Sequence, residues 1–112
     1  MLLNDTICAL STPQGMGAIA IIRLSGSEAF NIFDKIFKPY GKCAIKDATG
    51  YTMVFGKIMH NELLVDEAMA ALYRNPKSYT GEDTIEINCH GSVYIQEQIL
   101  RLLMEHGARM AE

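Results

Sequence analysis

The polar side chains of one alternating segment are the residues best suited to bind a ligand. Residues 84–90 alternate with a period of two, as a strand with one apolar and one polar face does. The polar face would carry Thr84, Glu86, Asn88 and His90, and the apolar face Ile85, Ile87 and Cys89. A carboxylate, an amide and an imidazole in a row suit the wall of a site for a small polar ligand. An ordinary solvated sheet face has the same pattern, so the segment alone does not identify a site.

Arg23 is a second candidate, because it interrupts an otherwise apolar segment from Ala18 to Leu24. Such a segment predicts a strand that is buried on both faces and central in its sheet. A guanidinium within it must extend to solvent, pair with a carboxylate or face a ligand. From the residues alone, a salt bridge within the sheet explains Arg23 as well as a ligand contact does.

Metal and triphosphate sites are not indicated. Cys89 and His90 are adjacent on the expected strand, so their side chains point to opposite faces and do not converge on one ion. Gly15 and Gly17 precede a strand instead of a helix, and the sequence contains no Gly-Lys-Ser/Thr. Both features argue against a phosphate-binding loop within these residues.

The expected elements place Arg23 and Glu86 on strands of one domain. The patterns predict strands at 4–10, 18–24, 51–60, 63–73, 84–90 and from 108 onward, and helices at 27–37 and 92–106. Ser27 and Ser92 are the expected helix caps, and Gly107 the end of the second helix. The alanines in 68–71 favour a helix by propensity, but a two-residue turn at Asn61 favours a hairpin.

The order of these elements predicts an α+β fold: a mixed, largely antiparallel sheet with helices packed on one face. Residues 1–112 are expected to form one domain. No terminating signal follows the last expected strand, so we expect the chain to be part of a longer protein. The first helix would carry its apolar side chains on one face, namely Ala29, Phe30, Phe33, Ile36 and Phe37.

Composition excludes several classes of protein. The sequence is 49% hydrophobic and 21% charged, which is typical of a globular protein and not of a disordered one. A net charge of −3 argues against a free-standing nucleic-acid binder. There is no membrane-length apolar segment and no signal-peptide pattern, so we expect no membrane association and a cytoplasmic location. Cys8, Cys43 and Cys89 lack a C-x-x-C spacing and are expected to be free thiols.

Several short motifs occur together in an order that resembles the family of tRNA modification GTPases known as TrmE or MnmE. They are Asn4-Asp5-Thr6-Ile7, Thr12-Pro13-x-Gly15-x-Gly17, Ile22-Arg23-Leu24-Ser25-Gly26 and Ser78-Tyr79-Thr80-Gly81-Glu82-Asp83, with Glu86 and His90-Gly91 after them. Each motif is weak by itself, but the set is specific and covers essentially the whole chain. The resemblance implies an N-terminal domain similar to the folate-binding domain of the glycine-cleavage T-protein.

The same resemblance implies a homodimer that binds a tetrahydrofolate derivative, 5-formyl- or methylene-tetrahydrofolate, as one-carbon donor. Arg23 and Glu86 match the folate-contacting positions of the family, and His90 and Tyr79 could line the same pocket. The complete proteins modify the wobble uridine of tRNA with their partner GidA, also called MnmG. We expect the GTPase domain, with its GTP, Mg²⁺ and K⁺, beyond residue 112, so no catalytic residue and no metal ligand is expected here.

Two other functions remain open. The chain could be a purely structural homodimerisation module that binds no ligand. It could also be an autonomous one-carbon transferase, for which a positioned acid or base would be needed. The carboxylates available for that role are Asp66, Glu67, Glu82 and Asp83. Such residues more often form a solvated face, so we disfavour the transferase.

Overall fold

A computed structural model describes residues 5–12, 17–42, 44–74 and 82–111. It contains a seven-stranded sheet in the order β3-β4-β5-β6-β2-β1-β7. The strands are β1 (Ile7–Leu10), β2 (Ile19–Ser25), β3 (Phe37–Pro39), β4 (Tyr51–His60), β5 (Leu63–Tyr73), β6 (Thr84–His90) and β7 (Arg109–Met110). Every neighbouring pair is antiparallel except β1 and β7, which are parallel. The mixed, mostly antiparallel sheet of the sequence analysis is thereby confirmed.

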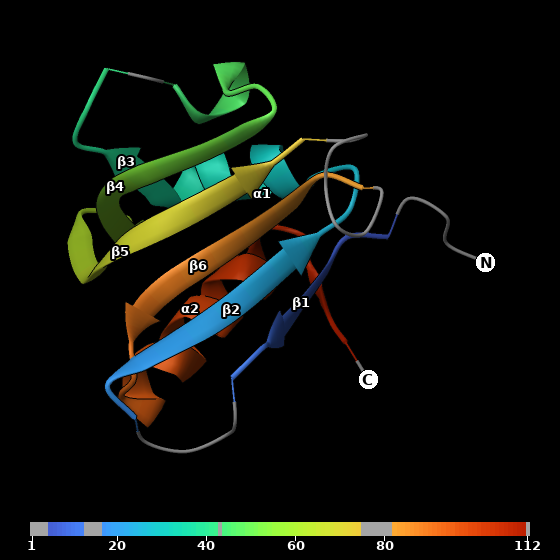
Figure 1. Ribbon diagram of the computed structural model, residues 1–112. Coiled ribbons are helices and arrows are strands. Elements are labelled where there is room, and N and C mark those ends of the chain that lie inside the picture. The colour runs from blue at the N-terminus through green and yellow to red at the C-terminus, as the bar shows by residue number, and fades with distance from the viewer. Residues whose placement is uncertain (1–4, 13–16, 43, 75–81, 112) are drawn as a thin grey trace.

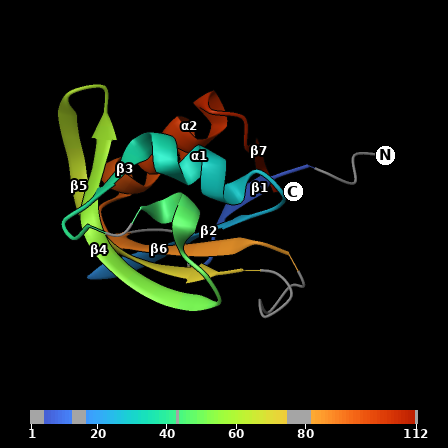
Figure 2. The same ribbon diagram turned by 90° about the horizontal axis from the view of Figure 1, so that it is seen from above.

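Two helices, α1 (Ala29–Ile36) and α2 (Val93–Glu105), lie on the same face of this sheet (Figure 2). A short 3-10 helix, η1 (Ile45–Asp47), packs beside α1. The core lies between the helices and the sheet, where Ile22, Leu24, Ile85 and Ile87 of the two central strands are fully buried. On the opposite face of the sheet, the described part of the chain places no helix (Figure 1). No helix of the described residues is long and apolar enough to cross a membrane.

The hairpin prediction is confirmed. β4 and β5 pair along their length, and Asn61 in the connection has a φ of 58°. Asparagine tolerates this left-handed conformation better than most residues do, which favours a tight turn at this position. The alanines at 68–71 are therefore in a strand, because pairing on both sides by β4 and β6 outweighs their helix propensity.

The second helix also agrees with its prediction. The Ser92 side chain caps α2 by accepting a hydrogen bond from the Ile95 N–H at 3.3 Å. Gly107 follows the helix with a φ of 116°, a conformation open to glycine at little cost. Beyond it, β7 forms where a further strand was expected.

The first helix differs from its prediction at both ends. It begins at Ala29 after Glu28, and no side-chain cap hydrogen bond is made by Glu28, so the expected cap at Ser27 is wrong. The helix ends at Ile36, and Phe37 begins β3. Phe37 keeps a buried position, because its ring stacks on Phe33 with centroids 4.5 Å apart. The apolar residues at helical spacing thus extend beyond the end of the helix, and the last of them, Phe37, lies in an edge strand.

Strand β2 is central, but it is buried on one face only. Ala20, Ile22 and Leu24 are buried, whereas the side chain of Ile19 is 63% exposed. The expectation of burial on both faces is therefore wrong, because both helices cover the same side of the sheet. The apolar residues of β2 that point the other way form part of an open surface.

Candidate ligand-binding site

Arg23 and Glu86 lie opposite each other on the open face of the sheet. β2 and β6 are antiparallel neighbours, and their register pairs Arg23 directly with Glu86. The flanking residues Ile22 and Leu24 point into the core, so alternation directs Arg23 outward. The two residues that the sequence analysis identified from distant segments are thus brought together by one strand pairing.

The two side chains form an ion pair. The Arg23 Nη2 lies 2.6 Å and its Nε 3.2 Å from the same Oε2 of Glu86. The side chains are 39% and 25% exposed, so both remain accessible from solvent. The salt bridge that the sequence left open as an explanation for Arg23 is present. Since both contacts use Oε2, neither of them occupies Oε1 of the carboxylate.

Tyr73 borders this ion pair and was not identified from the sequence. It ends β5 opposite Thr84, and its ring lies 5.0 Å from that of Tyr51. Burial raises the pKa of the Tyr73 hydroxyl, and the negative charge of Glu86 adds to this effect, while the positive charge of Arg23 opposes it. Tyr73 and Glu86 lie two positions apart in the register of neighbouring strands, close enough for the charges of Glu86 and Arg23 to act on the Tyr73 hydroxyl. Aromatic residues on the outward positions of paired strands were the signal that could have indicated it.

Large apolar side chains share the open face of the sheet with the ion pair. The exposed side chains on outward positions of β2, β4 and β5 are Ile19, Tyr51, Met53, Phe55 and Met69. A hollow of about 210 Å³ lies among them, lined by Ile19, Phe55, Glu67, Ala68, Met69, Asn88, Cys89 and His90. A larger hollow of about 380 Å³ lies away from Arg23 and Glu86, where Asp34, Lys38 and His60 line it between α1, α2 and the end of β4. We assign the candidate site to the open face, because Arg23 and Glu86 lie there.

His90, which the sequence placed near this site, is at the other end of β6. Its Nδ1 lies 2.6 Å from Oδ1 of Asp66. Tyr79, the other residue considered for the pocket, lies outside the described residues, as do Cys43 and Gly15. The described part of the chain contains no group of three or more histidine, cysteine, aspartate or glutamate residues that could hold a metal ion.

Cys89 and His90 point to opposite faces, as predicted. Cys89 is 3% exposed, and its thiol donates to the Ala20 carbonyl oxygen at 3.6 Å. Burial, together with the negative charge of Asp66, raises the pKa of this thiol to about 11. The thiol is therefore protonated near neutral pH and poorly nucleophilic.

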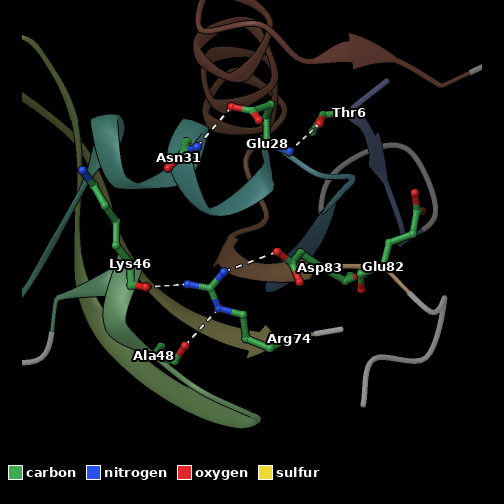
Figure 3. A network of polar contacts seen from close by, with 9 residues as sticks. Thr6, Glu28, Asn31, Lys46, Ala48, Arg74, Glu82 and Asp83 are labelled. Atoms are coloured by element: carbon green, nitrogen blue, oxygen red, sulfur yellow. Dashed lines mark hydrogen bonds and ion pairs between the residues drawn. The ribbon is translucent and has the colours of Figure 1, made fainter. Parts of the chain in front are cut away.

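Arg74 organises a separate polar network at the end of β5 (Figure 3). It donates from Nε to the Ala48 carbonyl oxygen at 2.9 Å and from Nη2 to that of Lys46 at 2.5 Å. Its Nη1 lies 3.3 Å from Oδ2 of Asp83, and its guanidinium lies 3.8 Å from the centre of the Phe30 ring. This network joins η1, α1, β5 and the start of β6, so Arg74 acts as a structural anchor.

Structural contacts involve Asp66, Glu67 and Asp83, three of the carboxylates considered for a transferase. Asp83 pairs with Arg74, Asp66 with His90, and Glu67 accepts a hydrogen bond from the Tyr40 hydroxyl. Asp83 precedes β6, whereas Asp66 and Glu67 are neighbours on β5, and each of the three is paired with a group other than Arg23 or Glu86. This arrangement gives the autonomous transferase no support.

Comparison with known proteins agrees with the motifs in this sequence. Residues 6–112 match the family described as "GTP-binding protein TrmE N-terminus". The chain is 49% identical over its whole length to a tRNA modification GTPase MnmE of Christiangramia forsetii, covering 24% of that protein. It is 50% identical to the MnmE of Parabacteroides distasonis and 48% identical to that of Staphylococcus haemolyticus, over 96% of this chain and 24% of each relative.

The chain therefore spans about a quarter of the length of these curated relatives. The family match covers nearly all of the chain and includes both strands that carry Arg23 and Glu86. The chain belongs to the family of TrmE N-terminal domains, which forms the N-terminal part of tRNA modification GTPases of the MnmE type.

Proposed function

We propose that this chain binds a reduced folate on the open face of its sheet and forms a homodimer through the same face. Within a longer enzyme it would hold 5-formyl- or methylene-tetrahydrofolate as the donor of a one-carbon unit. That enzyme would act on the wobble uridine of tRNA together with GidA/MnmG. GTP, Mg²⁺ and K⁺ would act in a different part of the longer protein.

The observation that carries the proposal is the Arg23–Glu86 pair on an accessible sheet face. A carboxylate can accept two parallel hydrogen bonds from an aminopyrimidinone edge such as that of a pterin. Because both Arg23 contacts use Oε2, a ligand could bond Oε1 directly and would share Oε2 with the guanidinium. The released or shared guanidinium could then bond a carbonyl oxygen of the ligand.

The apolar side chains of the open face support the homodimer. Contiguous exposed apolar surface commonly marks an interaction site, and here Tyr51, Met53 and Phe55 project from successive outward positions of β4. A second copy of the chain would remove these side chains from water. The Arg23–Glu86 pair lies on the same face, so dimerisation would also restrict access to the bound folate.

The ligand proposal is tested by calorimetric titration with 5-formyltetrahydrofolate, with molecular mass measured in the same buffer. We expect saturable binding by a dimer, and weaker binding by Arg23→Ala and Glu86→Gln. A dimer without binding would favour the alternative, a purely structural homodimerisation module. A monomer that binds folate would contradict the dimer alone.

The proposed dimer face is tested with a matched pair of charge substitutions. Phe55→Glu introduces a charge on the open face, where the Phe55 side chain is 47% exposed. Leu63→Glu introduces the same charge at the β4–β5 turn, at a side chain that is 71% exposed. Sedimentation should show a monomer for the first variant and a dimer for the second. Equal dimer stability in both variants would place the interface elsewhere.

A further inference from the structure

The pairing of β5 with β6 ends at Met69 and Asn88, and beyond this pair the two strands separate. The two strands pair from Tyr73 and Thr84 as far as Met69 and Asn88. Beyond that point β5 continues toward the β4–β5 turn while β6 ends at His90, and the strands spread apart (Figure 1). Asp66 connects the two strands where they are separated, because its Oδ2 accepts a hydrogen bond from the backbone N–H of His90 at 2.8 Å.

The same carboxylate orients the imidazole of His90. Oδ1 of Asp66 lies 2.6 Å from Nδ1 of His90, and the two side chains are 7% and 68% exposed. An ionised carboxylate only accepts hydrogen bonds, so the proton of a neutral imidazole is placed on Nδ1. Nε2, on the other side of the ring, is thereby directed away from Asp66 as a hydrogen-bond acceptor.

The hollow beside His90 fits one aromatic ring. Its volume is about 210 Å³, and Ile19, Phe55 and Met69 supply apolar walls. A cavity of about 150 Å³ with apolar walls suffices for benzene. Asn88 donates from its amide to the Met69 carbonyl oxygen at 3.2 Å, which fixes one polar group of the lining. An aromatic ring that carries an N–H donor is therefore the ligand chemistry this place suits.

We propose that this hollow binds the p-aminobenzoyl ring of the folate and that His90 Nε2 accepts a hydrogen bond from the amide beyond that ring. This inference rests on the proposed function, with the pterin at Glu86. On a strand, Asn88 lies about 7 Å and His90 about 13 Å from Glu86 along the chain. The order Glu86, Asn88, His90 thus matches the order pterin, ring, amide. Asp66 is a positioning residue that sets the tautomer of His90.

Two ligands separate this contact from the pterin contact. We would titrate the chain with 5-formyltetrahydrofolate and with 6-methyltetrahydropterin, which lacks the ring and amide. His90→Ala should lower the affinity for the folate about three- to tenfold, the effect of one neutral hydrogen bond, and leave that for the pterin unchanged. Glu86→Ala should lower both affinities. His60→Ala, on β4 outside this hollow, is the matched control and should lower neither.

Nitrogen NMR of wild-type protein gives a readout that needs no variant to fold. The His90 Nε2 resonance should shift when the folate is added at saturation and stay in place with the pterin alone. Ile19→Gln, at an exposed wall residue, should weaken folate binding without affecting the pterin.

Folate binding with an unmoved Nε2 resonance and unchanged affinity in His90→Ala would overturn this inference and leave the proposed function intact. An equal loss of pterin and folate affinity in His90→Ala would also overturn it. Absence of folate binding by the wild-type chain would overturn both.

Discussion

Two arginine–carboxylate pairs occupy different regions of this domain and differ in how many partners the arginine has. Arg74 contacts Asp83, two backbone carbonyl oxygens and the Phe30 ring. For Arg23, the hydrogen bonds found among the described residues all go to one oxygen of Glu86. The side-chain exposures are similar, at 29% for Arg74 and 39% for Arg23.

Exposure therefore does not distinguish the two arginines, but their partners do. A guanidinium whose donors are distributed over several fixed acceptors is held in place and stabilises the fold. A guanidinium with one accessible carboxylate can exchange contacts with a ligand. The comparison predicts that variants of the Arg74 network lower stability, whereas variants of the Arg23 pair lower affinity.

The largest effect is expected from Arg74→Ala. This change removes three hydrogen bonds and leaves the Lys46 and Ala48 carbonyl oxygens and Asp83 without the guanidinium. We expect the free energy of unfolding to fall by about 2–4 kcal/mol, measured by urea denaturation. Arg74→Lys keeps the charge but loses the forked geometry and should recover less than half of this loss. Full recovery with lysine would mean that charge alone matters at this position.

Glu86→Ala should affect affinity more than stability. Loss of a charged hydrogen-bonding partner is expected to weaken folate binding by about 1.5–3 kcal/mol, measured by calorimetry. The free energy of unfolding should change by less than about 1 kcal/mol, because accessible ion pairs contribute little. Unchanged affinity would remove Glu86 from the site. A large loss of stability would place the Arg23 pair in the same class as the Arg74 network.

Arg23→Ala provides a smaller test of the same contrast. Its effect on stability should stay below about 1 kcal/mol, well under that of Arg74→Ala in the same denaturation experiment. Equal effects of the two substitutions would contradict the comparison between the two pairs.

The smallest expected effect concerns Tyr73. Glu86→Gln should lower the pKa of Tyr73 toward its ordinary value, and Arg23→Ala should raise it further, because the two charges act in opposite directions. NMR titration of ring-labelled tyrosine would measure both shifts. Since the folded-state pKa is raised, this group's contribution to stability is complete below the unfolded pKa of about 10 and is lost as pH rises through the folded value. Shifts of the same sign in both variants would contradict the assignment of Tyr73 to this site.

Local patterns predicted much of this fold. Alternation in 84–90 gave the correct faces of β6, and Ser92 and Gly107 gave the correct limits of α2. The end of α1 was predicted too far along the chain. Phe37 is buried, and an apolar residue at this position fits the end of a helix as well as an edge strand. The burial of β2 was overestimated, since an apolar run does not reveal that both helices cover the same face.

The candidate site was predicted only in part. Arg23 was conspicuous as a charge within an apolar segment, and the family resemblance added Glu86. Their direct pairing depends on the register of β2 and β6, and the two residues are 63 positions apart in sequence. No local sequence pattern indicated the contacts of Arg74 or the Asp66–His90 contact, because each joins elements that meet only in the folded domain.

The parallel pairing of β1 and β7 places two strands that are far apart in sequence side by side. Ile7 is in register with Arg109, and the Arg109 side chain also contacts Asp5. During synthesis, β1 leaves the ribosome well before β7, so its outer edge stays unpaired by β7 until residue 110 has emerged. Contacts between such distant residues form slowly. The nascent domain therefore carries an exposed strand edge for most of its translation, a period in which other polypeptides could pair with it.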